Sequence, residues 1–589
     1  MPNTDTDGAE VKLTAVEGFK SASRGLYGPI PDELGSTAPF SECSSQLLKY
    51  HGTYQQDNRD TRTERKKAGL DKEYRMMLRT KFPAGHLTAE QYLACDALAT
   101  RYGQNDMRVT SRQDFQFHGV LKGNLRALIH DLNLYSKVTT FGCCGDVVRN
   151  TTGSPVADID PKYRNCGVNL LDVARRISAH FLPKTRSYYD LWLDDEKATV
   201  NSDGTVTFAA DVHSATAVEE PVYGTSYLPR KFKIGVTTDF DNSIDVFTND
   251  AGVIAATESG RVVGYEILAG GGLGYTHNKA ATFPRLATPI AFLTDEKEIV
   301  GVLEAIVKIF RDFGGRSDRK HARLKYLIED WGVDKFRAKV AEYYGKPLPE
   351  PRNIQPGSQP DYLGWSKQIQ PGSNYVGIWV ENGRIRDFGG SHQFKSGLRA
   401  IVERFKPDIR LTAQHRVILA NIRDEDVAAV QALLDEYSIP TDKGISTIRR
   451  AEMACPALPL CSLAMSEAER ALPDVMKAIE DAGHGDADVT IRMSGCPNNC
   501  SRPRTAEIGI VGWGTDRYQL YVAGHHLGTR LNATLVDKIA TKDLAPAIAA
   551  LLDAWKAGRA DGERFGDWSA RVGIDELRPL VSGVVAQKA

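Results

Sequence analysis

The segments DMRVTSRQDFQFHGV (residues 106–120) and DIRLTAQHRVILANI (residues 408–422) are the basis of the fold that we predict for this chain. Each opens with Asp-x-Arg-x-Thr and continues with alternating apolar residues, a pattern typical of β-strands. Each also follows an amphipathic helical stretch, at residues 87–103 in the first case and 396–407 in the second. The sequence therefore predicts one unit of strand, loop, helix and strand that is used twice.

A second pair of segments is similar in a looser way. Residues 233–274 and 489–530 both read as strand, turn and strand, followed by a glycine-rich loop that closes a hairpin. In this alignment, a loop with two cysteines in the second copy replaces TTDFDNS (237–243) in the first. Both pairs together predict a duplicated α+β architecture with a pseudo-twofold axis, which places equivalent loops around a central cleft. Chance similarity between strand-rich segments is the alternative.

The composition is that of an ordinary globular protein, with 42% hydrophobic and 25% charged residues among 589 and a formal net charge of −1. This balance does not favour a nucleic-acid or membrane-surface partner. No stretch reaches the roughly 18 uninterrupted apolar residues that a membrane span requires. The polar, acidic N-terminal residues lack the features of a secretory or transit signal, so we expect a cytoplasmic protein.

Four of the nine cysteines lie in two short loops near the C-terminus. Cys455 and Cys461 enclose five residues in CPALPLC, and Cys496 and Cys500 enclose three in CPNNC. Four thiolates from two separate loops suit a 4Fe-4S cluster. Zinc would also accept four thiolates, although CPALPLC is wider than the usual zinc spacing, and unrelated buried cysteines are a third reading.

These loops, in MACPALPLCSLAMSEAER and MSGCPNNCSRP, resemble those of the sulfite and nitrite reductases that carry siroheme. The likeness runs from HGTYQQDNRDTR (from residue 51) through MLRTKFPAG, SRQDFQFHG, CGDVVRN, YGTSYLPRKFKI and RSDRKHARLKY to FGDWSARVG. It covers nearly all of the chain after the first 36 residues. The family fold is a duplicated α+β module about a pseudo-twofold axis, which agrees with the repeats.

Residues 1–36 are polar and contain Gly and Pro, so we expect them to form a flexible N-terminal arm. For the rest of the chain we expect a ferredoxin-like half-domain at residues 37–122, which residues 350–425 complete as the second repeat. Residues 123–349 would form an α+β domain for siroheme and substrate. Residues 426–589 would form an α+β domain that binds the cluster and siroheme.

The resemblance implies roles for individual residues. Cys455, Cys461, Cys496 and Cys500 would bind the cluster, and Cys500 would also bridge to the siroheme iron. The anion would be bound by Arg79, Arg149, Lys231 and Lys233, of which the two lysines alternate and so project to one face of a strand. Without the family context, such a Lys-x-Lys pair would read as a solvated strand edge. The residues expected around the macrocycle are Arg108, Arg112, Gln116, His118, Arg319, Lys320 and Cys500.

The activity that the resemblance implies is the six-electron reduction of sulfite to sulfide by an external electron donor. YQQDNRD and THNKAATFPRL are more similar to the ferredoxin-dependent members than to those that pair with an NADPH flavoprotein. Nitrite reductase is the nearest alternative, but its members tend to have Asn where this chain keeps Lys233. A non-catalytic zinc protein is a further alternative and would be colourless.

Overall fold

The computed structural model describes residues 12–193, 197–200, 206–209, 220–389 and 391–587. Four five-stranded sheets carry the fold, and they form two matched pairs. The first pair is antiparallel throughout, in the order β1-β2-β5-β4-β15 in one sheet and β13-β14-β17-β16-β3 in the other. The strands are β1 (Thr53–Asp57), β2 (Tyr74–Arg79), β3 (His86–Leu87), β4 (Met107–Val109), β5 (Phe115–Val120), β13 (Gly364–Lys367), β14 (Ser373–Ile378), β15 (Arg384–Ile385), β16 (Asp408–Leu411) and β17 (Val417–Arg423).

The two antiparallel sheets exchange their last strands. β15 from the second repeat pairs with β4 of the first, and β3 from the first pairs with β16 of the second. A glycine at each crossing permits the close approach. A Cβ atom at Gly85 would lie 2.2 Å from the carbonyl oxygen of Leu411, and one at Gly383 would lie 2.6 Å from that of Val109. This reciprocal exchange confirms the predicted duplication about a pseudo-twofold axis.

Two helices at equivalent positions cover these sheets and confirm the predicted helical stretches. α5 (Ala89–Tyr102) begins with a capping box between Thr88 and Gln91, and α12 (Phe394–Phe405) is its counterpart. Asp96 of α5 forms ion pairs with Lys395 and Arg399 of α12. A buried carboxylate with two cationic partners therefore joins the two repeats on this side.

The second pair of sheets also has one common topology. The orders are β6-β9-β10-β11-β12 and β18-β19-β20-β21-β22, and in both the first three strands are parallel and the last two antiparallel to their neighbours. The predicted similarity of residues 233–274 and 489–530 is thus confirmed. The strands are β6 (Thr152–Gly153), β9 (Ile234–Thr238), β10 (Ala251–Glu258), β11 (Arg261–Ala269), β12 (Thr288–Leu293), β18 (Met453–Ala454), β19 (Ile491–Ser494), β20 (Ile508–Gly514), β21 (Arg517–Val522) and β22 (Ala533–Ala540).

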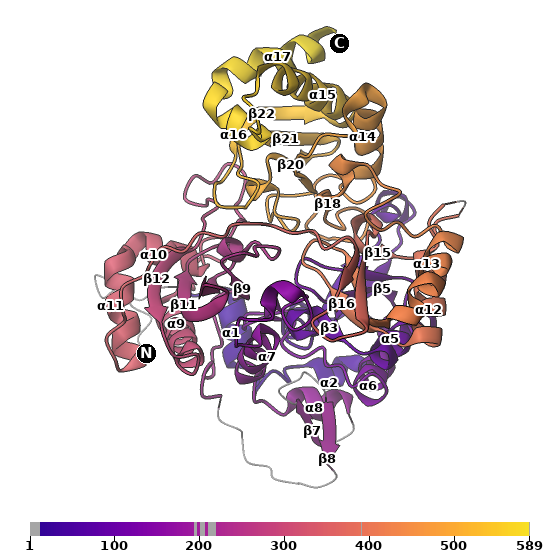
Figure 1. Ribbon diagram of the computed structural model, residues 1–589. Helices are drawn as coiled ribbons and strands as arrows, with labels where there is room; N and C mark the ends of the chain where they lie inside the picture. The colour runs from indigo at the N-terminus through magenta and orange to yellow at the C-terminus, as the bar shows by residue number, and fades with distance from the viewer. Residues whose placement is uncertain (1–11, 194–196, 201–205, 210–219, 390, 588–589) are drawn as a thin grey trace.

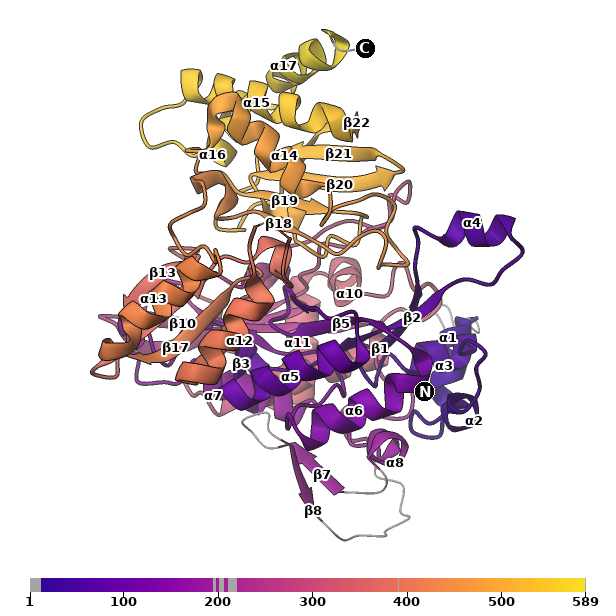
Figure 2. The same ribbon diagram turned by 90° about the vertical axis from the view of Figure 1, so that its right-hand side faces the viewer.

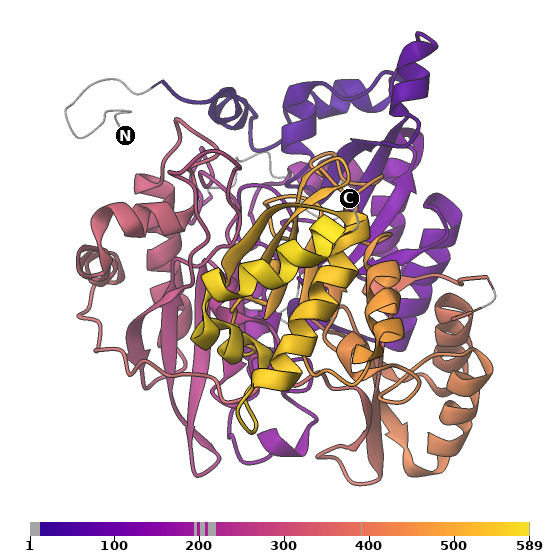
Figure 3. The same ribbon diagram turned by 90° about the horizontal axis from the view of Figure 1, so that it is seen from above.

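The sheet β18–β22 and its helices form a lobe of their own, at the top of Figure 1. Seen from above, this lobe lies over the middle of the remaining chain (Figure 3). Its own apolar core is separate from the two apolar clusters of the rest of the chain. The helices beside the sheet β6–β12 are α9 (Glu298–Phe313), α10 (Leu324–Trp331) and α11 (Val333–Tyr344). Those of the upper lobe are α14 (Leu472–Ile479), α15 (Thr541–Gly558), α16 (Phe565–Val572) and α17 (Ile574–Gln587).

Residues 12–36 do not form the loosely ordered arm that we expected. They fold into α1 (Ala15–Ser21) and α2 (Ile30–Leu34), and the side chains of Leu26 and Ile30 are fully buried. The polar composition of this segment hid its role, because its charges are used internally: buried Lys20 pairs with Glu17 and donates to the carbonyl oxygen of Leu228. Residues 1–11 lie outside the described residues.

The remaining elements connect the sheets. α4 (Arg62–Lys67) projects sideways from the body of the molecule, at about the height of the lower part of the upper lobe (Figure 2). Among the described helices, none has both the length and the apolar character needed to cross a bilayer. These elements are α3 (Glu42–Leu47), α4 (Arg62–Lys67), α6 (Leu125–Leu134), α7 (Leu170–His180), α8 (Ser187–Trp192), α13 (Val427–Glu436), β7 (Lys197–Val200) and β8 (Val206–Ala209).

Candidate metal centre and anion site

Two parallel strands bring the cysteine loops together. β18 ends one residue before Cys455, and β19 ends two residues before Cys496. Because Ala454 pairs with Met493 in parallel register, both loops leave the sheet at the same edge. Each of Cys455, Cys461 and Cys496 is close enough to Cys500 for their charges to interact. The four cysteines that the sequence singled out therefore form one group.

Hydrogen-bond donors surround three of the sulfur atoms. The Gly495 N–H donates to Cys455 Sγ (3.3 Å), the Asn498 side-chain amide to Cys496 Sγ (3.5 Å), and the backbone N–H of Ala464 to Cys461. Burial, followed by the nearby Cys500, raises the pKa of Cys455, Cys461 and Cys496 to about 12. Thiols in such surroundings ionise when a cationic metal centre binds them, and the N–H groups then stabilise the thiolates.

Hydrogen bonds with residues 273–275 hold the turn that precedes Cys500. Asn499 adopts a φ of +54°, a left-handed conformation that Asn tolerates better than most residues. Its side-chain amide donates to the carbonyl oxygen of Leu273 (2.7 Å), and the Tyr275 N–H donates to that of Pro497 (3.0 Å). The glycine-rich loop at residues 269–274 therefore lies directly against the second cysteine loop.

Cys500 differs from the other three cysteines because it is exposed and faces a group of cations. Lys231 and Lys233 flank Phe232 and both interact electrostatically with Cys500. Backbone hydrogen bonds of Phe232 with Val147 and Arg149 align this segment with residues 147–149. Within the part of the chain that the structure describes, neither lysine ammonium has a hydrogen-bond or ion-pair partner. These two cations are thus available to an anion next to Cys500.

Arg79 and Arg149 complete this group of cations. Arg79 Nε lies 3.7 Å from Asp114 Oδ1, and Arg149 donates to the Tyr54 hydroxyl (3.2 Å). The charges of Arg79 and Arg149 interact with each other, and Arg149 also interacts with Lys231. The four residues predicted to bind the anion lie in one site, and their roles remain predictions.

The crowding of these cations changes the acidity of the two lysines. Burial, with Arg149, Arg230 and Arg323 nearby, lowers the pKa of Lys231 to about 7. Burial, Arg112 and Lys231 lower the pKa of Lys233 well below its usual value. An ammonium with a pKa near the ambient pH is an efficient proton donor. This site can therefore both bind an anion and protonate it.

Several residues of this site had not been assigned from the sequence. Tyr54 forms hydrogen bonds with Arg149 and Cys144, and burial, the largest cause, raises its pKa to about 12. Burial also lowers the pKa of Lys49 to about 8, although Asp146 opposes the shift. Tyr54 lies in the segment HGTYQQD, which carries the family resemblance, whereas nothing in the local sequence marks Lys49.

The residues predicted around the macrocycle do not all face this site. Arg112 is buried beside it and donates to Asn249 Oδ1 (2.7 Å) and the Ile234 carbonyl oxygen (3.0 Å). Gln116 pairs with Arg79 across strands β5 and β2. Both residues therefore lie next to the cations described above.

Arg108 and His118 instead belong to a buried network at the first cysteine loop. Arg108 donates to Glu469 Oε2 (3.0 Å) and to the Ala454 carbonyl oxygen (2.6 Å), and His118 contacts Arg384. Arg319 forms a bidentate pair with Asp146, and Lys320 is exposed. The predicted roles of these four residues as direct ligands remain predictions.

The donors left over in this site suit an anionic cofactor. Buried Arg79 Nε and Arg149 Nε have no hydrogen-bond partner among the described residues. Leaving such groups unsatisfied in a buried site costs free energy, so each of them favours a ligand. A macrocycle with several carboxylates beside a cluster bound by four cysteines fits this arrangement.

Comparison with known sequences gives consistent matches over the chain. The pattern described as "Nitrite and sulphite reductase 4Fe-4S domain" matches residues 172–348 and 447–588, and that described as "Nitrite/Sulfite reductase ferredoxin-like half domain" matches residues 68–135 and 366–437. The sulfite reductase [ferredoxin] of Synechococcus elongatus is 40% identical over 97% of this chain and 91% of its own length. The sulfite reductase [NADPH] hemoprotein beta-component of Methylobacterium radiotolerans is also 40% identical, with the same coverage.

A solved structure supports the fold. The Mycobacterium tuberculosis NirA protein superposes with a TM-score of 0.78 over 98% of this chain and 100% of its own, at 23% sequence identity. The duplicated α+β arrangement described above is therefore shared with a known protein.

Proposed function

Because the chain belongs to the nitrite and sulphite reductase family, we propose that it reduces sulfite to sulfide with electrons from an external carrier protein. Members of this family are oxidoreductases, and their cofactors are siroheme and a 4Fe-4S cluster. The cluster would be held by Cys455, Cys461, Cys496 and Cys500. The siroheme would lie between Cys500 and the cations of the anion site.

The observation that carries this proposal is the pair of lysines beside Cys500 that have no partner among the described residues. Sulfite is a dianion with three oxygens. Arg79 and Arg149 offer it two permanent cations. Burial and neighbouring cations lower the pKa values of Lys231 and Lys233, and the negative charge of bound sulfite would hold both in the protonated form. Charge-assisted hydrogen bonds of this kind are the strong ones. Nitrite carries one charge and two oxygens, so it requires fewer cations. The charge of the site therefore favours sulfite.

These residues would act in binding and in proton delivery. When bound, siroheme and the cluster would pass on the electrons of the carrier protein and supply an iron for the sulfur atom. Arg79 and Arg149 keep their charge and would orient the sulfite oxygens. Lys231, whose pKa is near 7, would give a proton to an oxygen that leaves as water, and would regain one from solvent. Arg79 and Arg149 would thus hold the sulfite oxygens, and Lys231 would supply protons to the oxygens that leave as water.

The test of this proposal is turnover of sulfite and nitrite by the wild type and by Lys233→Asn, with a chemical reductant in excess. We expect the wild type to prefer sulfite. Lys233→Asn removes one of the cations that a dianion needs, so its kcat/KM for sulfite should fall by about tenfold more than that for nitrite. The ratio of the two kcat/KM values is the quantity to measure.

Lys542→Asn serves as the matched control, because Lys542 is exposed on α15 and no residue of the anion site belongs to that helix. It should leave the ratio as in the wild type. A wild type that prefers nitrite, or a Lys233→Asn variant with an unchanged ratio, would count against sulfite as the substrate.

We further propose that the electron donor is an acidic carrier protein such as a ferredoxin, which docks beside Cys461. Leu463 and Met465 follow this cysteine, and their side chains are 62% and 39% exposed. Arg59 donates to the carbonyl oxygens of Cys461 (3.3 Å) and Ala464 (3.2 Å), which ties the projecting α4 segment to this loop. An apolar patch at the metal centre therefore adjoins a basic helix.

Charge reversal on α4 tests the docking proposal. Lys66 and Lys67 are exposed on α4, and an acidic donor would approach them by electrostatic attraction. Lys66→Glu combined with Lys67→Glu should lower the rate with reduced ferredoxin by about tenfold at low salt and less at high salt. The rate with a small chemical reductant should stay the same.

Arg404→Glu combined with Lys406→Glu, two exposed cations at the end of α12, provides the control and should have no such effect. A flavoprotein donor remains the alternative, because both kinds of protein occur among the relatives. Equal rates with ferredoxin for the α4 variant and the wild type would exclude this surface as the docking site.

A further inference from the structure

Asp245 and Arg502 occupy the same position in the two mixed sheets. Asp245 precedes the short helix Val246–Thr248 between β9 and β10, and Arg502 precedes the short helix Pro503–Thr505 between β19 and β20. Both adopt the left-handed conformation, with φ and ψ of 51° and 60° for Asp245 and 59° and 41° for Arg502. Residues with side chains rarely adopt it, so the two loops share an unusual shape as well as a place in the fold.

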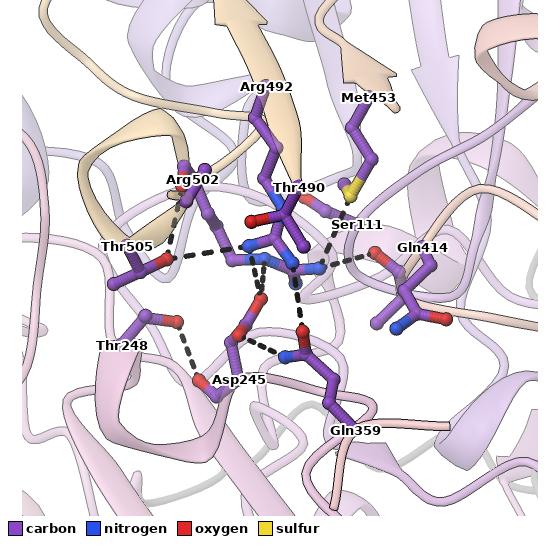
Figure 4. A network of polar contacts seen from close by, with 12 residues as sticks. Ser111, Asp245, Thr248, Gln359, Gln414, Met453, Thr490, Arg492, Arg502 and Thr505 are labelled. Atoms are coloured by element: carbon purple, nitrogen blue, oxygen red, sulfur yellow. Dashed lines mark hydrogen bonds and ion pairs between the residues drawn. The ribbon is translucent and has the colours of Figure 1, made fainter. Parts of the chain in front are cut away.

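These counterparts bind each other across the pseudo-twofold axis. Arg502 Nε lies 2.6 Å from Asp245 Oδ2, and Arg492 Nη1 lies 2.7 Å from the same oxygen. The Gln359 side-chain amide donates to Asp245 Oδ1 (2.6 Å). Figure 4 shows the carboxylate of Asp245 enclosed by these three side chains. The Asp245 side chain has no exposed surface, so its carboxylate is surrounded by protein groups and not by solvent.

The carboxylate is charged at neutral pH. Burial by itself would raise the pKa of Asp245, but Arg492 and Arg502 outweigh it and hold that pKa below its usual range. A buried ion pair with several hydrogen bonds fixes the geometry of the groups that it joins, and removal of one partner leaves the other charge uncompensated. The Asp245 contact is therefore a rigid link.

This link reaches the backbone segments that carry three of the four cysteines. Arg502 follows Cys500 by two residues, and Arg492 precedes Cys496 by four. Arg502 also donates to the Ala413 carbonyl oxygen (2.7 Å) and contacts Met453 Sδ (3.7 Å), two residues before Cys455 (Figure 4). Both cysteine loops are thus linked, through Arg492 and Arg502, to the carboxylate of Asp245, which lies between β9 and β10 of the other mixed sheet.

We propose that Asp245 is a positioning residue for Cys500. Its ion pair with Arg502 fixes the turn that presents the Cys500 sulfur both to the other three cysteines and to the anion site. The counterpart loop of the first sheet, at residues 237–248, therefore has a role of its own, because it supplies the carboxylate that the cysteine loop of the second sheet needs. The inference depends on cluster binding by the cysteines and not on the identity of the anion or the donor.

Two consequences distinguish this role from a general contribution to stability. Removal of the negative charge leaves Arg492 and Arg502 unbalanced, which stabilises the more negative, reduced state of a nearby cluster. Its midpoint potential should then become more positive. Loss of this link should also let the Cys500 turn move, which should speed the release of iron to a chelator and change the electron paramagnetic resonance spectrum of the reduced centre.

The experiment compares the holoenzymes of Asp245→Asn and Arg502→Lys with the wild type, under anaerobic conditions and with a chemical titrant. For Asp245→Asn we expect a more positive midpoint potential and iron release at least severalfold faster. Arg502→Lys keeps the charge but cannot span Asp245, Ala413 and Met453 together. It should speed iron release and change the spectrum with a smaller change in potential. No step depends on sulfite turnover, so failure of the proposed function would leave these results interpretable.

Asp96→Asn is the matched control, because Asp96 is also a buried carboxylate with two cationic partners but lies between α5 and α12. It should lower thermal stability and leave the potential and the spectrum as in the wild type. If Asp245→Asn does not fold with its cofactors, Arg502→Lys still decides the matter. A wild-type spectrum and wild-type iron release in Arg502→Lys, or equal effects of Asp96→Asn and Asp245→Asn, would overturn the proposal.

Discussion

Cys500→Ser should lower sulfite turnover by at least about 100-fold, because loss of a metal ligand exceeds the 10- to 100-fold effects of changes around the ligands. Cys455 and Cys496 are buried and Cys461 is half-buried, whereas Cys500 is exposed. Cys500 interacts with Lys231 and Lys233 as well as with the other three cysteines. It is therefore placed to belong to both the cluster and the anion site. Serine offers a poor ligand for iron and breaks the contact between them.

Iron content, the visible spectrum and the electron paramagnetic resonance spectrum should be recorded with the rate. We expect Cys500→Ser to lose the magnetic coupling between cluster and heme even where iron is retained. Cys43→Ser, at a half-buried cysteine of α3, is the control and should behave as the wild type. Full activity in Cys500→Ser would refute the bridging role.

The second large effect concerns the proton donor. We expect kcat/KM for sulfite to fall as the pH rises through about 7, because burial and the nearby Arg149, Arg230 and Arg323 place the pKa of Lys231 there. The active form is the protonated ammonium, which is lost above this pKa. Lys231→Met removes the donor and one cation, so the rate should fall by about 100-fold or more. The step near pH 7 should disappear with it.

Sulfite itself changes its protonation near neutral pH, so nitrite turnover must be measured in parallel. Nitrite stays a monoanion over this range, and any step near pH 7 seen with nitrite belongs to the enzyme. Arg149 and Arg79 keep their charge throughout, so they add no step. The assignment of Lys231 would be wrong if Lys231→Met kept the wild-type profile with nitrite.

The duplication and the grouping of the cysteines could be predicted from the sequence because both leave local traces. The Asp-x-Arg-x-Thr openings and alternating strands repeat at 106–120 and 408–422, and the structure places both segments at equivalent positions. Likewise, CPALPLC and CPNNC each follow a strand, and adjacent parallel strands bring such loops to one edge. Strand periodicity and turn chemistry depend on neighbouring residues, which a sequence displays directly.

Charged residues were harder to place. The four predicted anion-binding residues do lie together, as the family resemblance implied: Lys231, Lys233, Arg79 and Arg149. Arg108, however, forms an ion pair with Glu469, which is far from it in the sequence. Residues 12–36 looked loosely ordered because their composition is polar, yet their charges pair inside the protein. A charged side chain can be solvated, paired or ligand-binding, and its own neighbours in sequence do not distinguish these states.

From the sequence alone we could predict a duplicated α+β protein and propose that its four C-terminal cysteines lie together. The tertiary structure was needed to show which strands the two halves exchange, which lysines of the described residues have no partner and which carboxylate holds the cysteine loop. The pair of Asp245 and Arg502 joins residues that are 257 positions apart. Such a contact follows from how whole sheets pack around the pseudo-twofold axis, because the stability of a buried charge depends on everything that surrounds it.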